Sequence, residues 1–362
     1  MGENLAEAKL LLNWTSTLSS GFSHATFLAI RLCLAASASM LFGGTRFMGR
    51  YVLKALLKEG ADVTIANRGT REENIGATNV ICDRSQPGAL DQFANSKFDV
   101  VIDFSAYASA WVEEAGNFFA NKIEKYIFIS TGAVYSSSNI FPITEDFPKG
   151  PPHPFADYAS EKNRSEALLQ EFSNKGFFTT TACRLPFVLG PDNYEDRESF
   201  AFSRLLKGLP ILLGNGGKSI HSFLYAGDVA DAIVAIINAG KKVDKQAFNI
   251  ATQQATTSRG FVELAAKVCK KETNILPYNP DDFALDVANF DLRNVAFPFP
   301  ENNGYLGSEK IKEMIGFVPK HNLESMLEIY LKWWLERGDL EPKGYPLEQR
   351  ILEKLIHSQK LH

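Results

Sequence analysis

Short apolar runs alternate with amphipathic segments from about residue 40 to residue 250. Runs typical of strands lie at Asp62–Ala66, Asn79–Cys82, Asp99–Asp103, Tyr126–Ser130 and Phe178–Cys183. Between them, Arg50–Glu59 carries apolar residues at helical spacing, and Ser160–Phe172 also indicates a helix. Strands that are separated by helices pair in parallel through right-handed crossovers, so the pattern predicts an α/β protein with a doubly wound parallel sheet.

The pattern changes after Leu185, where the loops become longer and richer in Gly, Pro and aromatic residues. Two later segments are expected to return to the sheet, a helix at Asp228–Ala239 and a strand at Ala247–Ile250. Near the end of the chain, Leu323–Trp334 and Leu347–Leu361 repeat apolar residues at helical spacing. We expect both to be packing helices, and a dimer contact is an alternative for the second.

Composition narrows the class of protein. The chain has 362 residues, 45% hydrophobic and 22% charged, and a formal net charge of −4. These values exclude a disordered chain, a collagen-like fibre and a polytopic membrane protein, and they give no overall attraction to nucleic acid. The four cysteines form no CxxC pair, so we expect free thiols in a reducing, cytoplasmic compartment. The histidines have no ligand-like spacing, and we predict no metal site.

The first 39 residues differ from the rest of the chain. The stretch Phe27–Ser39 is apolar and small, but Arg31 interrupts it, and Glu3 and Glu7 precede it. A secretory signal has a basic start and an unbroken apolar run, and an organelle transit peptide is rich in arginine. We therefore interpret residues 1–39 as an N-terminal extension ahead of a domain that begins near Met40.

The short apolar run Met40-Leu-Phe-Gly43 is the first expected strand, and a glycine motif, Gly43-Gly-Thr-Arg-Phe-Met-Gly49, lies between it and the first expected helix. Gly43 allows a tight turn, Gly49 allows close packing of helix on sheet, and the helix N-terminus offers N–H groups to a pyrophosphate. The motif therefore predicts a dinucleotide site of the Rossmann type. The residues expected there are Gly43, Thr45, Arg46, Phe47, Met48 and Gly49.

The end of the second strand decides between the two nicotinamide dinucleotides. An acidic residue there would bind the ribose hydroxyls of NAD, but this chain has Asn67 and Arg68. Because Arg46 and Arg68 suit a 2′-phosphate, we predict NADP over NAD. Asp83 is expected at the adenine end, with Ser105 and Ala106 lining the cofactor.

A phenol and an ammonium, Tyr158 and Lys162, are four residues apart and therefore on one face of a helix. The lysine would lower the tyrosine pKa and hold the nicotinamide ribose, so that the tyrosinate accepts a proton from a substrate hydroxyl. Thr131 follows the fifth strand and can share the substrate oxygen with Tyr158. We predict Thr131, Tyr158 and Lys162 as the catalytic residues, with Lys162 also contacting the cofactor.

Three further residues are not assigned to catalysis. Tyr135 is interpreted as either a cavity or a core residue, and His153 and His221 as loop or packing residues.

The expected domain layout begins with an extension at 1–39, followed by a Rossmann domain at 40–185 to which 225–250 returns. A smaller α/β substrate-binding region covers 186–224 and 251–340, and a helical tail covers 341–362.

These features together resemble the extended and atypical short-chain dehydrogenase/reductase superfamily, in its NAD-dependent epimerase/dehydratase branch. The resemblance covers roughly residues 40–337 and includes Arg184-Leu-Pro186 with Gly190-Pro191 and Gly227-Asp-Val-Ala230. The glycine motif looks most like that of the chloroplast stem-loop-binding proteins and their bacterial relatives. So do Asn67-Arg-Gly69, Tyr278-Asn-Pro280 and Ala296–Phe299 followed by Leu306–Lys310.

The resemblance implies an NAD(P)-dependent epimerase or oxidoreductase that acts on a hydroxyl or keto carbon of a sugar nucleotide or a similar metabolite. The plant RNA-binding members generally lack the catalytic tyrosine, so Tyr158 favours retained catalysis. Sugar-nucleotide 4,6-dehydratases carry an acidic pair where this chain has Gly132 and Ala133, which argues against dehydration. The alternative is an RNA-binding or regulatory protein on the same fold. A homodimer is implied by the resemblance alone.

Overall fold

The structure is a computed structural model, and it describes residues 37–69, 76–150, 156–283, 296–338 and 340–359. Nearly all of the expected N-terminal extension, and also His153, lie outside the described residues. None of the helices in the described ranges is long and apolar enough to cross a membrane.

Seven parallel strands form the main sheet, in the order β10-β6-β5-β4-β1-β2-β3. Their bounds are β1 (Ala38–Phe42), β2 (Asp62–Asn67), β3 (Thr78–Ile81), β4 (Val100–Asp103), β5 (Lys125–Thr131), β6 (Thr179–Leu185) and β10 (Gln246–Asn249). The doubly wound parallel sheet is therefore confirmed, and the expected strands agree with these bounds to within two residues. The strand order reverses between β1 and β4, because β2 and β3 follow on one side of β1 and β4, β5 and β6 on the other, and such a switch point is where doubly wound sheets bind ligands.

Helices cover both faces of this sheet. They are α3 (Met48–Lys58), α4 (Ser109–Phe118), α5 (Ala156–Asn174) and α7 (Ala226–Asn238). In α3 the apolar spacing turns Val52, Leu53 and Leu56 into the core, and Gly60, with φ of +85°, ends the helix as expected. The cluster around α3 and α7 lies on one face of the sheet, and the cluster around α4 and α5 lies on the other.

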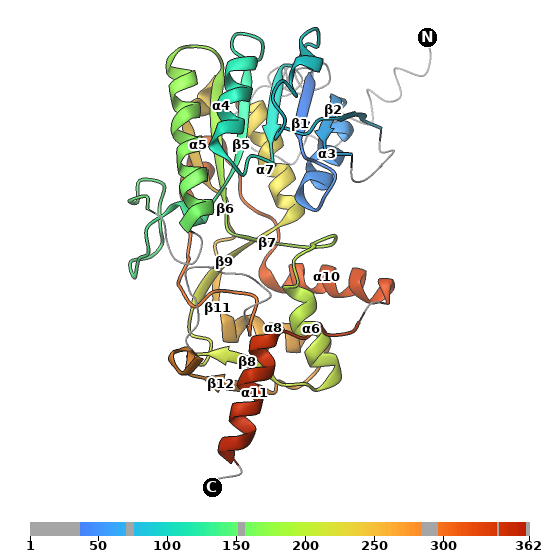
Figure 1. Cartoon of the computed structure of the whole chain (residues 1–362), viewed down its shortest axis with the longest axis vertical. Helices are drawn as coiled ribbons and strands as arrows, with labels where there is room; N and C mark the ends of the chain where they lie inside the picture. The colour runs from blue at the N-terminus through green and yellow to red at the C-terminus, as the bar shows by residue number, and fades with distance from the viewer. Residues whose placement is uncertain (1–36, 70–75, 151–155, 284–295, 339, 360–362) are drawn as a thin grey trace, which may run out of the picture.

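The second half of the chain builds a smaller region against one end of the sheet (Figure 1). Its strands are β7 (Phe187–Leu189), β8 (Ile211–Gly214), β9 (Ile220–Tyr225), β11 (Ala255–Thr257) and β12 (Ile275–Tyr278). Its helices are α6 (Glu198–Lys207), α8 (Ser258–Cys269), α10 (Leu323–Arg337) and α11 (Pro346–Gln359), and α9 (Glu309–Ile315) packs back on the main core. The core of this region is strongly aromatic, with Phe223, Phe261 and Phe299 in mutual ring contact.

Short 3₁₀ turns complete the fold at η1 (Asp91–Phe93), η2 (Gly132–Val134), η3 (Gly240–Val243) and η4 (Pro280–Phe283). Because the main strands are parallel, their carboxyl ends lie along one edge of the sheet. In Figure 1 this edge faces the smaller region, and the candidate site lies there.

Candidate active site

The turn between β1 and α3 is built by the glycine motif. Gly43 and Gly44 both have φ of +94°, a backbone conformation that favours glycine. Gly49 lies so close to this turn that a Cβ atom on it would be 2.4 Å from the Gly44 Cα atom. Glycine is therefore required for the turn at one end of the motif and for the close approach of the helix at the other.

Helix α3 directs its N-terminus into a cleft of about 540 Å³. The residues predicted to bind the cofactor that line this cleft are Gly43, Thr45, Arg46, Phe47, Met48, Gly49, Asn67, Arg68, Asp83 and Ser105. Ala106 is buried in the core instead, and Lys162 lines a neighbouring cavity. A helix N-terminus beside glycine backbone that lines the cleft suits the pyrophosphate of a dinucleotide, so the cleft fits the expected cofactor.

Charged side chains of both signs line the cleft near the carboxyl ends of β1, β2 and β3. The Asn67 side chain accepts a hydrogen bond from the Gly69 N–H at 2.7 Å and so shapes the turn. Hydrogen bonds from Ser85 lower the pKa of Asp83, and the positive charge of Arg68 lowers it further. Arg46 and Arg68 therefore stand along the same cleft as the Asp83 carboxylate.

A buried ion pair supports the floor of the cleft, and the sequence analysis missed it. Arg84 Nη1 lies 2.7 Å from Asp103 Oδ2, and Tyr126 donates a hydrogen bond of 2.6 Å to the same oxygen. Asp103 also accepts from the Ser105 N–H at 3.0 Å. Arg84 follows β3 and Asp103 ends β4, and both strands end at the same carboxyl edge of the sheet although β1 and β2 lie between them. That shared edge was the available signal.

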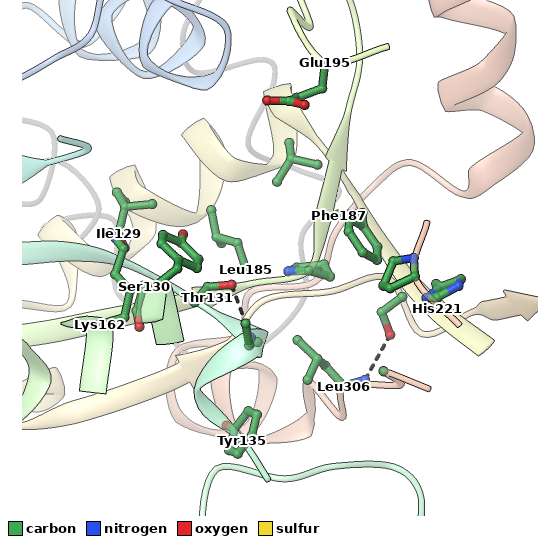
Figure 2. Close-up of a pocket in the computed structure, with 18 of the residues that line it drawn as sticks. Ile129, Ser130, Thr131, Tyr135, Lys162, Leu185, Phe187, Glu195, His221 and Leu306 are labelled. Atoms are coloured by element: carbon green, nitrogen blue, oxygen red, sulfur yellow. Dashed lines mark hydrogen bonds between the residues drawn. The ribbon is translucent and has the colours of Figure 1, made fainter. Parts of the chain in front are cut away.

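A second cavity of about 380 Å³ adjoins the cleft and contains all three predicted catalytic residues. The two cavities share several wall residues: Phe47, Met48, Phe104, Tyr107, Tyr194 and Glu195. Figure 2 shows Thr131 and Leu185 near the centre of the second cavity, Ile129, Ser130 and Lys162 on one side, and Phe187 and His221 on the other. A molecule in it would lie between the predicted catalytic residues and the smaller region.

Thr131 and Tyr158 come together from two different elements. Thr131 ends β5, and its hydroxyl accepts a hydrogen bond of 3.2 Å from the Ala133 N–H, which fixes the side chain at the start of η2. Tyr158 is 37% exposed, and its partial burial raises its pKa, Tyr107 adds to that rise, and a hydrogen bond with Thr131 opposes it. The pair therefore presents two hydroxyls that can hold one substrate oxygen.

Lys162 lies one helical turn from Tyr158 on α5 and is 2% exposed. Its Nζ atom donates a hydrogen bond of 2.8 Å to the Ile129 carbonyl and lies 5.6 Å from the centroid of the Tyr158 ring. Burial lowers the pKa of Lys162 to about 8, although the nearby carboxylates of Asp103 and Glu166 oppose this change. The lysine is thus held against the sheet, below the phenol.

The orientation of α5 is fixed by Glu166, which is one turn beyond Lys162. Its buried carboxylate accepts hydrogen bonds of 2.6 Å from Ser130, 2.7 Å from Arg184 Nη2 and 2.6 Å from Lys149. These donors come from β5, from β6 and from the loop after η2. The network ties the helix that carries Tyr158 to the strand that carries Thr131.

Two residues left open by the sequence prove to be both packed and cavity-lining. Tyr135 is 2% exposed and donates a hydrogen bond of 2.7 Å to Asn249 Oδ1. His221 packs among aromatic rings, as expected, and its Nε2 lies 3.2 Å from both Ser219 Oγ and Ser258 Oγ. Burial lowers the pKa of His221 to about 3, so the ring is neutral near neutral pH.

Three other cavity residues were missed by sequence reasoning. Tyr107 and Tyr194 stand at the boundary of the two cavities, and the Phe47 and Tyr194 rings meet edge to face at 6.4 Å. Arg197 is the cation among the main electrostatic influences on Tyr158 and lowers its pKa, a role that the sequence assigned to Lys162. Tyr194 and Arg197 belong to the loop after β7, whose side-chain directions no periodicity predicts.

Across the described ranges, no group of three or more His, Cys, Asp or Glu side chains is placed to hold a metal ion.

The matched family model decides the classification. The model of the NAD dependent epimerase/dehydratase family matches residues 40–251, more than half of the chain. The chain belongs to this family. Membership of this family agrees with the Rossmann-type sheet and with the resemblance seen in the sequence motifs.

Individual relatives agree with this membership. The chain is 29% identical over 322 residues to the chloroplast stem-loop binding protein of 41 kDa b from Arabidopsis thaliana, covering 80% of this chain and 78% of the relative. Its fold is similar to that of UDP-glucose 4-epimerase with UDP-glucose from Thermotoga maritima (TM-score 0.69, 20% identity, 83% of this chain and 100% of the other). It is also similar to UDP-glucuronic acid 4-epimerase from Bacillus cereus with UDP-glucuronic acid and NAD (TM-score 0.67, 16% identity, 83% and 99%).

Proposed function

We propose that this family member is an NAD(P)-dependent epimerase or reductase that acts on a hydroxyl or keto carbon of a sugar nucleotide. The observation that carries the proposal is the meeting of Thr131, Tyr158 and Lys162 in a cavity that shares a wall with the glycine-turn cleft. Two similar structures hold UDP-sugars, which supports this substrate class.

The residues of the cavity divide the chemistry among them. As the tyrosinate, Tyr158 accepts the proton of the substrate hydroxyl while the carbon is oxidised to a carbonyl, and the neutral phenol returns that proton on reduction. Thr131 holds the same oxygen by hydrogen bonding. Lys162, fixed by the Ile129 carbonyl, supplies positive charge below the phenol and a contact for the cofactor ribose. A bound nicotinamide supplies the acceptor and donor of hydride.

We do not expect dehydration as the net reaction. Gly132 and Ala133 follow Thr131, so neither can act as the acid that expels water. Glu195 is a carboxylate that lines the cavity, but it also lines the cofactor cleft and so stands at the shared boundary. This placement supports epimerisation or reduction over elimination.

For the cofactor, the positions of Arg46 and Arg68 along the cleft support NADP, whereas the family name and one similar structure point to NAD. The test is to denature the purified protein and identify any nucleotide that is released. Stoichiometric NAD would indicate a retained cofactor and therefore an epimerase. A protein that releases nothing and then binds NADPH in titration would indicate a reductase that exchanges its cofactor in each turnover.

A second candidate follows from the similarity to the stem-loop binding protein. If the protein binds neither nicotinamide dinucleotide, the proposed enzyme is ruled out and an RNA-binding role is favoured. Salt-dependent RNA affinity that is unchanged by Tyr158→Phe would support this second candidate, because contacts to the RNA backbone respond to salt and not to a phenol in a cavity.

A further inference from the structure

Arg197 is a cation in the substrate cavity that the proposed mechanism leaves without a role. It is the N-cap residue of α6, and it lines the cavity that holds Tyr158 without lining the cofactor cleft. Its Nε atom is buried and has no hydrogen-bond partner, and none of its side-chain nitrogens forms a hydrogen bond or ion pair among the described residues. Arg197 is half-buried, whereas the fully buried arginines among the described residues, Arg84, Arg184 and Arg204, are each paired with a carboxylate.

Such an arrangement costs free energy in the ligand-free protein. A guanidinium that has lost part of its water needs hydrogen-bonding or ionic partners, and an unpaired one destabilises the fold. The partial compensation visible here is the Phe187 ring, whose centroid is 5.1 Å from the guanidinium carbon. This contact satisfies none of the five N–H donors of an arginine.

The two carboxylates near Arg197 in the sequence, Glu195 and Glu198, form no ion pair with it. Glu198 accepts hydrogen bonds of 2.7 Å from the Gly190 N–H and 2.8 Å from Asn193 Nδ2. Glu195 acts on Arg197 through its charge but forms no ion pair with it, and it also faces the cofactor cleft. The protein therefore leaves the guanidinium open toward the cavity.

We infer that Arg197 binds an anionic group of the substrate, through phosphate or carboxylate oxygens, and so selects for negatively charged substrates. The inference rests on the proposed function, which assigns this cavity to the substrate. A guanidinium binds two such oxygens side by side, and its planar donors match both groups. Because Arg197 lies outside the cofactor cleft, the anion it awaits belongs to the substrate and not to the dinucleotide. In a sugar nucleotide the anion is either the diphosphate linkage or a carboxylate on the sugar.

The test is direct binding, measured by titration calorimetry on the protein as purified. Wild type and Arg197→Met are each titrated with UDP, UDP-glucose and UDP-glucuronate at fixed ionic strength. We expect the variant to bind about 10- to 100-fold more weakly, the range for a lost hydrogen-bonded charge. Weakening toward all three ligands assigns Arg197 to the diphosphate, and weakening toward UDP-glucuronate alone assigns it to the carboxylate. Arg197→Lys, which keeps the charge, should restore part of the affinity.

A stability measurement separates this role from a structural one. Removing an unpaired cation should raise the thermal midpoint of ligand-free Arg197→Met by a few degrees. The matched control is Arg204→Met on the same helix, where Arg204 pairs with Glu348 at 2.6 Å. We expect that control to lower the midpoint and to leave ligand affinity unchanged, and the exposed Arg164→Met replaces it if it does not fold.

The assignment is overturned if wild type binds none of the three ligands, if Arg197→Met binds them as wild type does, or if the variant loses thermal stability as well as affinity. These results do not depend on turnover. If Arg197 governs binding but Tyr158→Phe keeps full activity, the proposed mechanism fails and the anion site stands.

Discussion

The cofactor cleft and the substrate cavity share a wall but are built in different ways. The cleft depends mainly on one continuous stretch, Gly43–Gly49, whose backbone forms the turn and the helix N-terminus. The cavity is assembled from side chains on β5, α5, the loop after β7 and the segment near Leu306, as Figure 2 shows in part.

This difference teaches which changes each site can tolerate. A site made by backbone N–H groups should keep its function when most of its side chains are substituted. It should lose that function when a substitution adds atoms at a position where two backbone segments are in close contact. A site made by side chains keeps its shape when one functional group is removed, and it loses only what that group contributed.

Removing the Tyr158 hydroxyl should give the largest change. We expect Tyr158→Phe to lower kcat by about 10²–10⁴-fold, the usual range for a lost general acid–base, while cofactor affinity stays near that of wild type. Steady-state kinetics and cofactor titration check this. The control is Tyr305→Phe, because the Tyr305 hydroxyl bonds to the Gln253 carbonyl and lines neither cavity. Full activity in Tyr158→Phe would refute the proposed mechanism.

Adding one methyl group at Gly49 should weaken cofactor binding more than replacing the charged side chains of the cleft does. In Gly49→Ala the new Cβ atom would meet the Gly44 backbone at 2.4 Å, so the turn has to move. We expect loss of cofactor binding and a decrease of about 1–3 kcal/mol in the free energy of unfolding. Urea unfolding and cofactor titration measure both, with the exposed Gly344→Ala as control. Unchanged cofactor affinity would mean that the cleft is not built by its backbone.

The buried His221 should make the cavity wall sensitive to acid. Its pKa is lowered to about 3 in the folded protein, against 6.5 in the unfolded chain, so below pH 6.5 the unfolded state binds the extra proton. Stability is then lost as the pH falls from 6.5 toward 3, by about 2 kcal/mol at pH 5. Urea unfolding at pH 7 and pH 5 should show a smaller loss in His221→Gln than in wild type. The exposed His357→Gln should behave as wild type does, and an equal loss in all three proteins would contradict the prediction.

The smallest effect concerns the choice of cofactor. We expect the double variant Arg46→Gln with Arg68→Gln to weaken NADPH binding about tenfold more than NADH binding, because exposed charge contacts contribute modestly. Fluorescence titration with each dinucleotide measures the ratio. Equal weakening of both would mean that these arginines contact the shared part of the cofactor and not a 2′-phosphate.

Periodicity predicted most of the fold because burial repeats along the chain. The parallel strands, the helix ending at Gly60 and the returning strand β10 all follow from local pattern and from the crossover rule. Helix α3 begins two residues earlier than predicted, at Met48, because the glycine turn leads straight into it. The spacing of apolar residues does not locate this first residue of the helix, because the backbone of the preceding glycine turn sets it.

By itself, the sequence determined the glycine turn, the sheet and the joint presence of Thr131, Tyr158 and Lys162, because those features depend on residues close together or on a simple strand order. Only the tertiary structure decided that Arg84 pairs with Asp103 beneath the cleft, that Ala106 is core, and that Arg197 stands unpaired in the cavity. The physical reason is that the partners of a side chain depend on which loops and strand ends the fold brings together. The spacing of apolar and polar residues along the chain does not specify those contacts.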